Sequence, residues 1–138
     1  MTHIVYAKYL ESEVLSADPV KLIDMLYRGA LDAVAAARLH LRERQIQERS
    51  RKIVKAFEIL HELSRSLDQE KGGDISRRLA DLYAYMQMRL MNANTEQSEK
   101  PLIEVENLLT VLYEAWRTVP QGSAQPTDSE YSPLGCAG

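Results

Sequence analysis

The amino-acid sequence predicts an all-α protein, an antiparallel four-helix bundle with a short N-terminal arm and a disordered C-terminal tail. Apolar residues recur at intervals of three and four through most of the chain, and signals typical of strands are nearly absent. Four helical segments of about 20 residues, joined by short connections, pack most economically as an antiparallel bundle. We therefore expect an N-terminal arm at 1–17, a helical bundle domain at 18–119 and a disordered, Pro-, Gly- and Ser-rich tail at 120–138.

Capping residues set the expected bounds of the first two helices. Asp18 is a favourable N-cap, and Pro19 loses no hydrogen bond at the first helical position, so the first helix should run from there to residues 42–44. The second helix should cover about 48–70 and end at 72–73, because that Gly-Gly pair allows the left-handed backbone that terminates many helices.

The last two helices are bounded in the same way. Asp74 should cap a third helix over about 75–94. A polar stretch at 94–98 separates it from a fourth helix, which should begin near Ser98 or Pro101 and end at Val119.

The composition excludes several classes of protein. The 138 residues are 45% apolar and 27% charged with a formal net charge of −3, which is ordinary for a soluble globular protein and argues against nucleic-acid binding. No apolar run approaches the roughly 18 residues of a membrane span, so no membrane insertion is expected. Cys136 is the only cysteine, and the first residues do not resemble a secretory signal, so a cytoplasmic location is expected by default.

The second and fourth predicted helices have the apolar content of ordinary bundle members. In the second helix the expected core stripe is Ile53, Phe57, Leu60, Leu63 and Leu67. In the fourth helix it is Val105, Leu108, Leu112, Ala115, Trp116 and Val119.

The first predicted helix carries more apolar surface than a bundle member needs. Its polar side chains between residues 20 and 37 form one narrow stripe, Lys21, Asp24, Arg28 and Asp32. The face expected in the core is Ile23, Leu26, Ala30, Val34, Ala37 and Leu41. A further apolar flank remains, made of Leu22, Met25, Gly29, Ala33 and Ala36. This flank either packs closely against a neighbouring helix or the arm, or forms a groove for a partner.

The third predicted helix has a similar surplus. Its expected core stripe is Ile75, Leu79, Leu82, Met86, Leu90 and Ala93, and beyond it lie Tyr83, Tyr85, Met88 and Met91. Methionine repacks easily and tyrosine combines apolar area with a polar tip, so both suit a partner-binding surface; alternatively, they fill core gaps and cover the rim. Together the two helices suggest hydrophobic grooves for helical segments of another protein.

Catalytic motifs are missing from the sequence. There is no Gly-rich phosphate loop and no His-Glu-x-x-His motif. Glu58 and His61 form the one Glu-x-x-His unit, of which di-iron bundles use two, so a solvated pair is the better interpretation. We expect no catalytic residue, no cofactor and no metal site; a metal- or cofactor-binding bundle enzyme is the rival that metal analysis of the purified protein tests.

Three blocks of the sequence, in order, form a pattern that is similar to one family. The first block is Val14, Ser16-Ala17, Pro19, Leu22-Ile23, Met25-Leu26-Tyr27 and Gly29-Ala30. The second is Leu67-Asp68, Glu70-Lys71-Gly72-Gly73, Ile75, Leu79, Leu82-Tyr83, Tyr85-Met86, Arg89-Leu90 and Ala93-Asn94. The third is Glu104-Val105-Glu106, Leu108-Leu109 and Ala115-Trp116. Over about residues 4–118 the chain resembles the flagellin-export chaperones of the FliS family, with Arg28 at a position that is commonly Asp or Asn.

The resemblance implies a function as well as a fold. Members of the family are cytoplasmic helical bundles that bind the disordered C-terminal segment of flagellin in hydrophobic grooves. Binding prevents premature polymerisation, and the complex is delivered to the flagellar export gate. The N-terminal arm covers part of the groove in the free chaperone and is displaced when the client binds.

The resemblance also implies partner-binding residues, matched position by position. The covering arm would be Ile4, Tyr6, Tyr9, Leu10 and Val14. One groove would be lined by Leu22, Met25, Leu26, Gly29 and Ala33, and another by Tyr83, Met86, Leu90 and Met91. The alternative function is a helical-bundle regulatory adaptor that binds another helical client, such as an anti-sigma factor or a co-chaperone.

Overall fold

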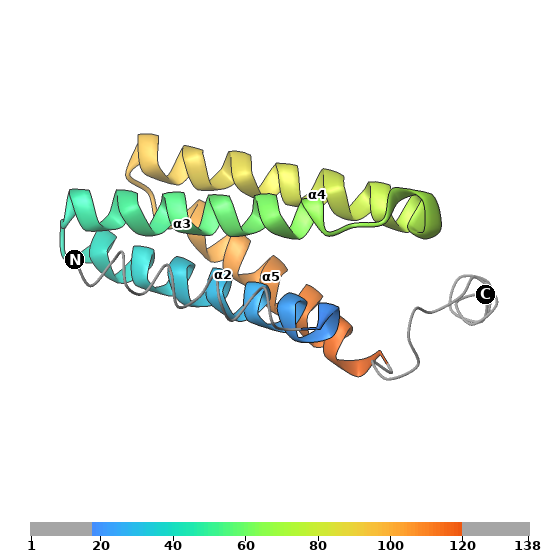
Figure 1. The fold of residues 1–138 in the computed structure, drawn as a ribbon. Coiled ribbons are helices and arrows are strands. Elements are labelled where there is room, and N and C mark those ends of the chain that lie inside the picture. The colour runs from blue at the N-terminus through green and yellow to red at the C-terminus, as the bar shows by residue number, and fades with distance from the viewer. Residues whose placement is uncertain (1–17, 120–138) are drawn as a thin grey trace.

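The computed structural model describes residues 18–119, which form an all-α bundle. Its helices are α2 (Pro19–Arg42), α3 (Ile46–Arg65), α4 (Gln69–Glu96) and α5 (Lys100–Thr118), and successive helices run in opposite directions (Figure 1). Helices α2 and α4 each pack against both α3 and α5, so the four helices surround one core. No strand occurs among residues 18–119, which confirms the predicted antiparallel four-helix bundle. The predicted arm and tail lie outside the described residues.

The start of α2 follows the capping prediction. The Asp18 carboxylate accepts a hydrogen bond from the Lys21 backbone N–H at 2.8 Å, and Pro19 is the first helical residue. The helix ends at Arg42, within the predicted range. The chain therefore enters the bundle through a fixed turn.

The connection between α3 and α4 differs from the prediction. Helix α3 ends at Arg65, and α4 begins at Gln69, because the Asp68 carboxylate accepts hydrogen bonds from the next turn, among them one from the Lys71 N–H at 3.0 Å. Asp74, the predicted cap, instead pairs with Arg77. Gly73 adopts the left-handed φ of +54° and kinks α4, so the glycine pair bends one helix rather than ending another.

The core draws on all four helices. Its fully buried side chains are Ala30, Val34 and Ala37 of α2, Ile53, Ala56 and Leu60 of α3, Met86, Leu90 and Ala93 of α4, and Leu102, Val105 and Leu109 of α5. Two predicted core positions are wrong. Ile75 lies just after the kink and is 48% exposed, and Ala115 faces solvent, since Leu109 sets the inward face of α5.

An aromatic cluster around two buried tyrosines joins α2, α4 and α5. The hydroxyls of Tyr27 and Tyr83 are 2.7 Å apart and share a hydrogen bond, and burial raises the pKa of both phenols. The Tyr27 ring stacks on Tyr113, with 5.7 Å between centroids, and Tyr113 stacks on Trp116. Tyr113 also donates to the Asp24 carboxylate at 2.5 Å. Tyr83, expected on the partner-binding surface, is therefore a core residue.

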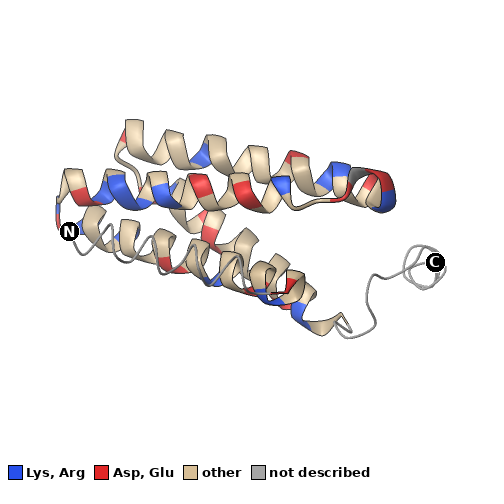
Figure 2. Ribbon diagram, viewed as in Figure 1, with Lys and Arg blue, Asp and Glu red and all other residues tan. Residues whose placement is uncertain are grey.

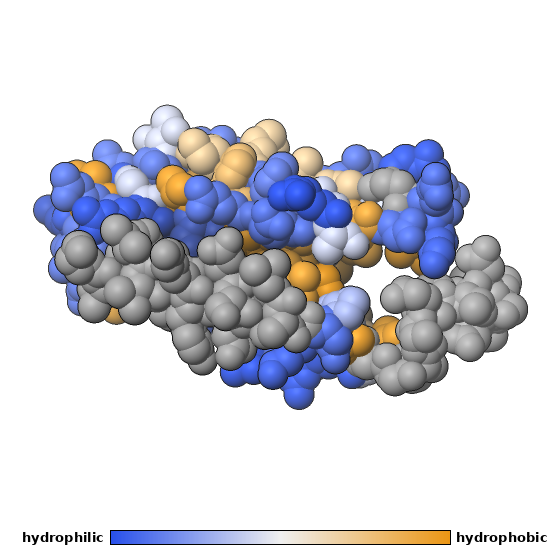
Figure 3. Space-filling model, viewed as in Figure 1, coloured by the Kyte–Doolittle hydropathy of each residue, from blue (hydrophilic) through white to orange (hydrophobic). Residues whose placement is uncertain are grey.

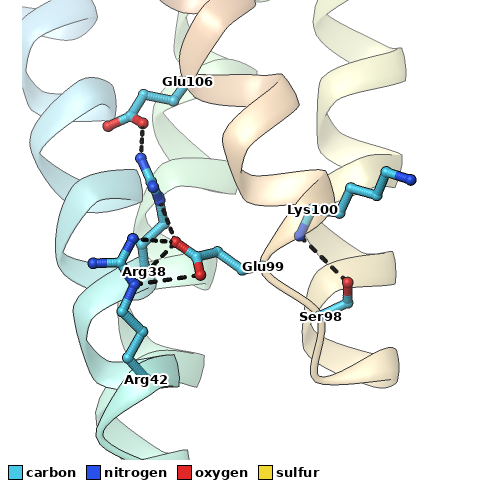
Figure 4. A network of polar contacts seen from close by, with 6 residues as sticks. All are labelled: Arg38, Arg42, Ser98, Glu99, Lys100 and Glu106. Carbon is cyan, nitrogen blue, oxygen red and sulfur yellow. Dashed lines mark hydrogen bonds and ion pairs between the residues drawn. The ribbon is translucent and has the colours of Figure 1, made fainter.

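An ion-pair network fixes the other end of α2 to the connection before α5 (Figure 4). Arg38 Nε donates to Glu99 at 2.8 Å, and Arg42 Nη2 donates to the same carboxylate at 2.6 Å. Arg38 also pairs with Glu106. Hydrogen bonds from Arg42 and then Arg38 lower the pKa of Glu99. Both arginines are thus paired with carboxylates within the bundle.

Tyr27→Phe tests the buried tyrosine pair. The substitution leaves the Tyr83 hydroxyl buried without its partner, so the free energy of unfolding should fall by about 1–2 kcal/mol in urea denaturation. Tyr27→Phe with Tyr83→Phe should cost less than the sum of the single substitutions, because no polar group is then stranded. Single variants as stable as the wild type would contradict a stabilising hydrogen bond between the two buried hydroxyls.

Glu99→Gln tests the ion-pair network through its pH dependence. A lowered folded-state pKa contributes stability above the unfolded carboxyl pKa, and this contribution is lost as the pH falls through the lowered value. The substitution should cost about 1 kcal/mol or less near pH 7, and the difference from the wild type should shrink towards about pH 3. The matched control is Glu62→Gln, whose partner Arg65 is exposed on the same helix, and it should change little. A pH-independent difference for Glu99→Gln would contradict the network's role.

Candidate functional site

A large open groove lies between the first half of α2 and the second half of α3. The two helices lie close together near their connection and diverge away from it (Figure 1), and Figure 3 shows hydrophobic side chains in the hollow between them. The volume is about 950 Å³. The residues that line this α2–α3 groove are Met25, Leu26, Arg28, Gly29, Asp32, Lys55, Phe57, Glu58, Ile59, His61 and Glu62.

The floor of the α2–α3 groove is apolar. Met25 and Leu26 come from α2, Phe57 and Ile59 from α3, and all four side chains are partly buried. A Cβ atom added at Gly29 would lie only 3.3 Å from the Ile59 Cδ1 atom, so this glycine keeps the floor open next to α3. The sequence therefore leaves apolar surface unburied at the place where the two helices separate.

The rim of the groove is charged and carries both signs. Arg28 and Lys55 supply positive charge, and Asp32, Glu58 and Glu62 supply negative charge. An apolar floor between charged edges is the pattern that receives the apolar face of an amphipathic helix. A second hollow of about 370 Å³ lies where Lys21 of α2 meets Trp116 and Arg117 of α5, and its rim is mostly charged.

The residues predicted to line the first groove have three different outcomes in the structure. Met25, Leu26 and Gly29 line the α2–α3 groove. Leu22 is partly buried outside the lining, whereas Ala33 is a buried core residue and offers no surface. The predicted arm residues Ile4, Tyr6, Tyr9, Leu10 and Val14 lie outside the described residues.

The α3 side of the groove was missed by the sequence prediction. Phe57 packs against the core as expected, but it also lines the groove together with Ile59, which was not singled out. A helical wheel of α3 alone assigns Phe57 inward, and only the divergence of α2 exposes it. Gly29 is the residue in the sequence that could have indicated the groove, because a glycine inside an apolar helix often marks a close approach by a neighbouring element.

Most of the residues predicted to line the second groove do not lie on the surface. Tyr83, Met86 and Leu90 are buried in the core, so they have no surface to offer a partner. Met91 does lie on the surface, together with Tyr85 and Met88. The outward face of α4 is therefore apolar, but Met91 is the only residue on it among the four matched to the second groove.

Residues 18–119 contain no cluster of His, Cys, Asp or Glu side chains that could hold a metal ion. None of the described helices is long and apolar enough to cross a membrane. A helical bundle with an open apolar groove of this kind has the character of a protein-binding module.

Comparison with known proteins identifies the family. Residues 1–123 match the family described as flagellar protein FliS. The chain is 42% identical over 118 residues to the flagellar secretion chaperone FliS of Salmonella typhimurium, covering 84% of this chain and 87% of the relative. It is 36% identical over 117 residues to the FliS chaperone of Campylobacter jejuni, covering 85% and 91%, and 29% identical over 116 residues to that of Bacillus subtilis, covering 84% and 86%.

The chain belongs to the FliS family of flagellar secretion chaperones. It is therefore a flagellar export chaperone rather than an enzyme, and its client is a flagellar protein. The resemblance drawn from the three sequence blocks is confirmed.

Proposed function

We propose that this protein acts in the cytoplasm and binds the disordered C-terminal segment of flagellin in the α2–α3 groove. Binding there prevents premature polymerisation, and the complex is delivered to the flagellar export apparatus. The observation that carries the proposal is the open groove of about 950 Å³ with its apolar floor and charged rim. Membership of a flagellar secretion chaperone family supports a flagellar client.

The size and chemistry of the groove suit a helical segment. Its volume lies near the upper end of about 300–1,000 Å³ for small-molecule pockets, and its open, elongated form between two helices favours a side-chain stripe over a compact ligand. A client that folds on binding loses conformational entropy, which lowers the affinity for a given buried area. Binding of this kind protects the client and still allows its release for export.

The expected arm fits the same site. The chain reaches Asp18 directly before α2, and the groove begins at Met25, two turns further along the helix. Residues 1–17 are therefore long enough to reach the groove, and we propose that their apolar residues cover it in the free chaperone. The client then displaces an intramolecular cover rather than water alone.

A calorimetric titration with a C-terminal flagellin peptide tests the client. Burial of apolar surface with coupled folding should give a large negative heat-capacity change, and circular dichroism should show a gain of helix. A flagellin peptide from which the C-terminal end has been removed is the control and should not bind. A silent titration with the intact segment, combined with binding of an anti-sigma factor or co-chaperone helix, would instead support a regulatory adaptor.

Gly29→Leu tests the groove. The added side chain should occupy the floor beside Ile59 and weaken peptide binding at least about tenfold, which corresponds to 1.4 kcal/mol. The variant should remain folded, because leucine favours a helix more than glycine does. The matched control is Ala35→Leu, which adds the same side chain at an exposed position of α2 outside the groove. Equal affinity of Gly29→Leu and the wild type would place the binding site elsewhere.

A further inference from the structure

The two basic residues on the rim of the α2–α3 groove already have partners. Arg28 donates to the Asp24 carboxylate, one turn earlier on α2, at 3.3 Å. Lys55 of α3 also has an interaction partner within the chain. A client that approaches either cation therefore competes with a contact that the protein makes by itself.

Two rim carboxylates, one on each helix, are unpaired among residues 18–119. Asp32 of α2 and Glu58 of α3 are both exposed, and neither side chain forms an ion pair or a hydrogen bond within that range. The remaining acidic rim residue, Glu62, pairs with Arg65 at 3.3 Å. Figure 2 shows acidic residues on both α2 and α3. The unpaired charge of the rim is therefore negative on both sides of the apolar floor.

The two unpaired carboxylates lie at nearly the same level of the groove. Gly29 and Ile59 mark one level, because a Cβ atom at Gly29 would lie 3.3 Å from the Ile59 Cδ1 atom. The helices are antiparallel (Figure 1), so Asp32 is three residues nearer to their connection than Gly29, and Glu58 is one residue nearer than Ile59. Asp32 and Glu58 are thus offset by two residues, which is about 3 Å along the helix axes.

We infer that Asp32 and Glu58 select a client helix that carries a Lys or Arg on each flank of its apolar stripe. The inference rests on the proposed function, since it specifies which kind of helix the groove binds. In a helix laid on the apolar floor, the residues directly before and after a floor residue point about 100° to either side, towards the two rims. These two residues are about 3 Å apart along the axis, which matches the offset between the carboxylates.

The extent of the groove adds a length to this pattern. The lining spans residues 25–32 of α2 and 55–62 of α3, which is about two helical turns on each side. A client helix of that length places apolar side chains on the floor at intervals of three and four residues. The basic pair belongs near the end where α2 and α3 converge, because Asp32 is the lining residue of α2 closest to the connection.

The rim carboxylates contribute selectivity more than affinity. An exposed ion pair changes a dissociation constant by about 1.5-fold to fivefold, and salt weakens it. The apolar floor accepts amphipathic helices in general, whereas the rim favours those with basic flanks and disfavours those with acidic flanks. Asp32 and Glu58 are therefore specificity-determining residues of the groove.

Calorimetric titration of the full chain with the C-terminal flagellin peptide at low and high salt tests the rim. Asp32→Asn combined with Glu58→Gln should raise the dissociation constant about threefold to tenfold at low salt, and the difference should largely disappear near about 1 M salt. The matched control is Asp81→Asn, which removes the same charge from an exposed position of α4 outside the groove and should leave the dissociation constant unchanged. Circular dichroism confirms that each variant is folded.

A second peptide separates direct pairing from a general effect of charge. With every Lys and Arg of the flagellin peptide replaced by Gln, the wild type and the double variant should bind with equal affinity, because the partners of both carboxylates are gone. Equal losses for both peptides would overturn the inference.

The same titrations distinguish this inference from the proposed function. If the flagellin peptide binds the wild type and the double variant equally at low salt while Gly29→Leu still weakens binding, the selective role of the rim is wrong and the groove remains the site. If the peptide does not bind the wild type, or if Gly29→Leu binds it normally, the proposed function and the inference are both overturned.

Discussion

The arrangement of α2 with α3 and α5 as its main neighbours is the constraint on which the groove depends. In a four-helix bundle each helix buries about half of its circumference, and α2 carries apolar residues well beyond that half. Small buried residues such as Ala30 and Ala37 let α2 approach its neighbours closely. Where α2 and α3 diverge, Leu26 and Phe57 line a groove, so the rest of residues 18–119 leaves that surface open.

Polar contacts at both ends of α2 keep this arrangement in place. At its start the Tyr27–Tyr83 hydrogen bond and the stacked rings tie the helix to α4 and α5, on the side away from α3. At its end Glu99 binds Arg38 and Arg42 together. These contacts hold both ends of α2 to helices other than α3, with Tyr83 of α4 and Tyr113 of α5 at its start and Glu99 at its end. The groove is formed by the bundle itself, and a preformed site lowers the entropic cost that the chaperone contributes to binding.

The sequence predicted the bundle, the start of α2 and part of the groove, because these depend on local capping and on the period of one helix. It misplaced the end of α3, since Asp68 and Asp74 are equally plausible caps until the kink at Gly73 is known. It placed Tyr83 at the surface because periodicity does not reveal a partner hydroxyl on another helix. It did not predict that Phe57 also lines the groove, because a groove depends on two helices and their divergence.

Methyl NMR of the methionines is the most direct measurement of the central claim, that the client binds between α2 and α3. Met25 lies in the α2–α3 groove, Met86 is buried in the core, and Met88 is exposed on α4 outside the groove lining, so three signals report three places. Addition of the C-terminal flagellin segment to dilute, full-length protein should shift the Met25 methyl signal strongly and leave Met88 in place. A strong shift of Met88 with an unchanged Met25 would contradict the groove as the binding site.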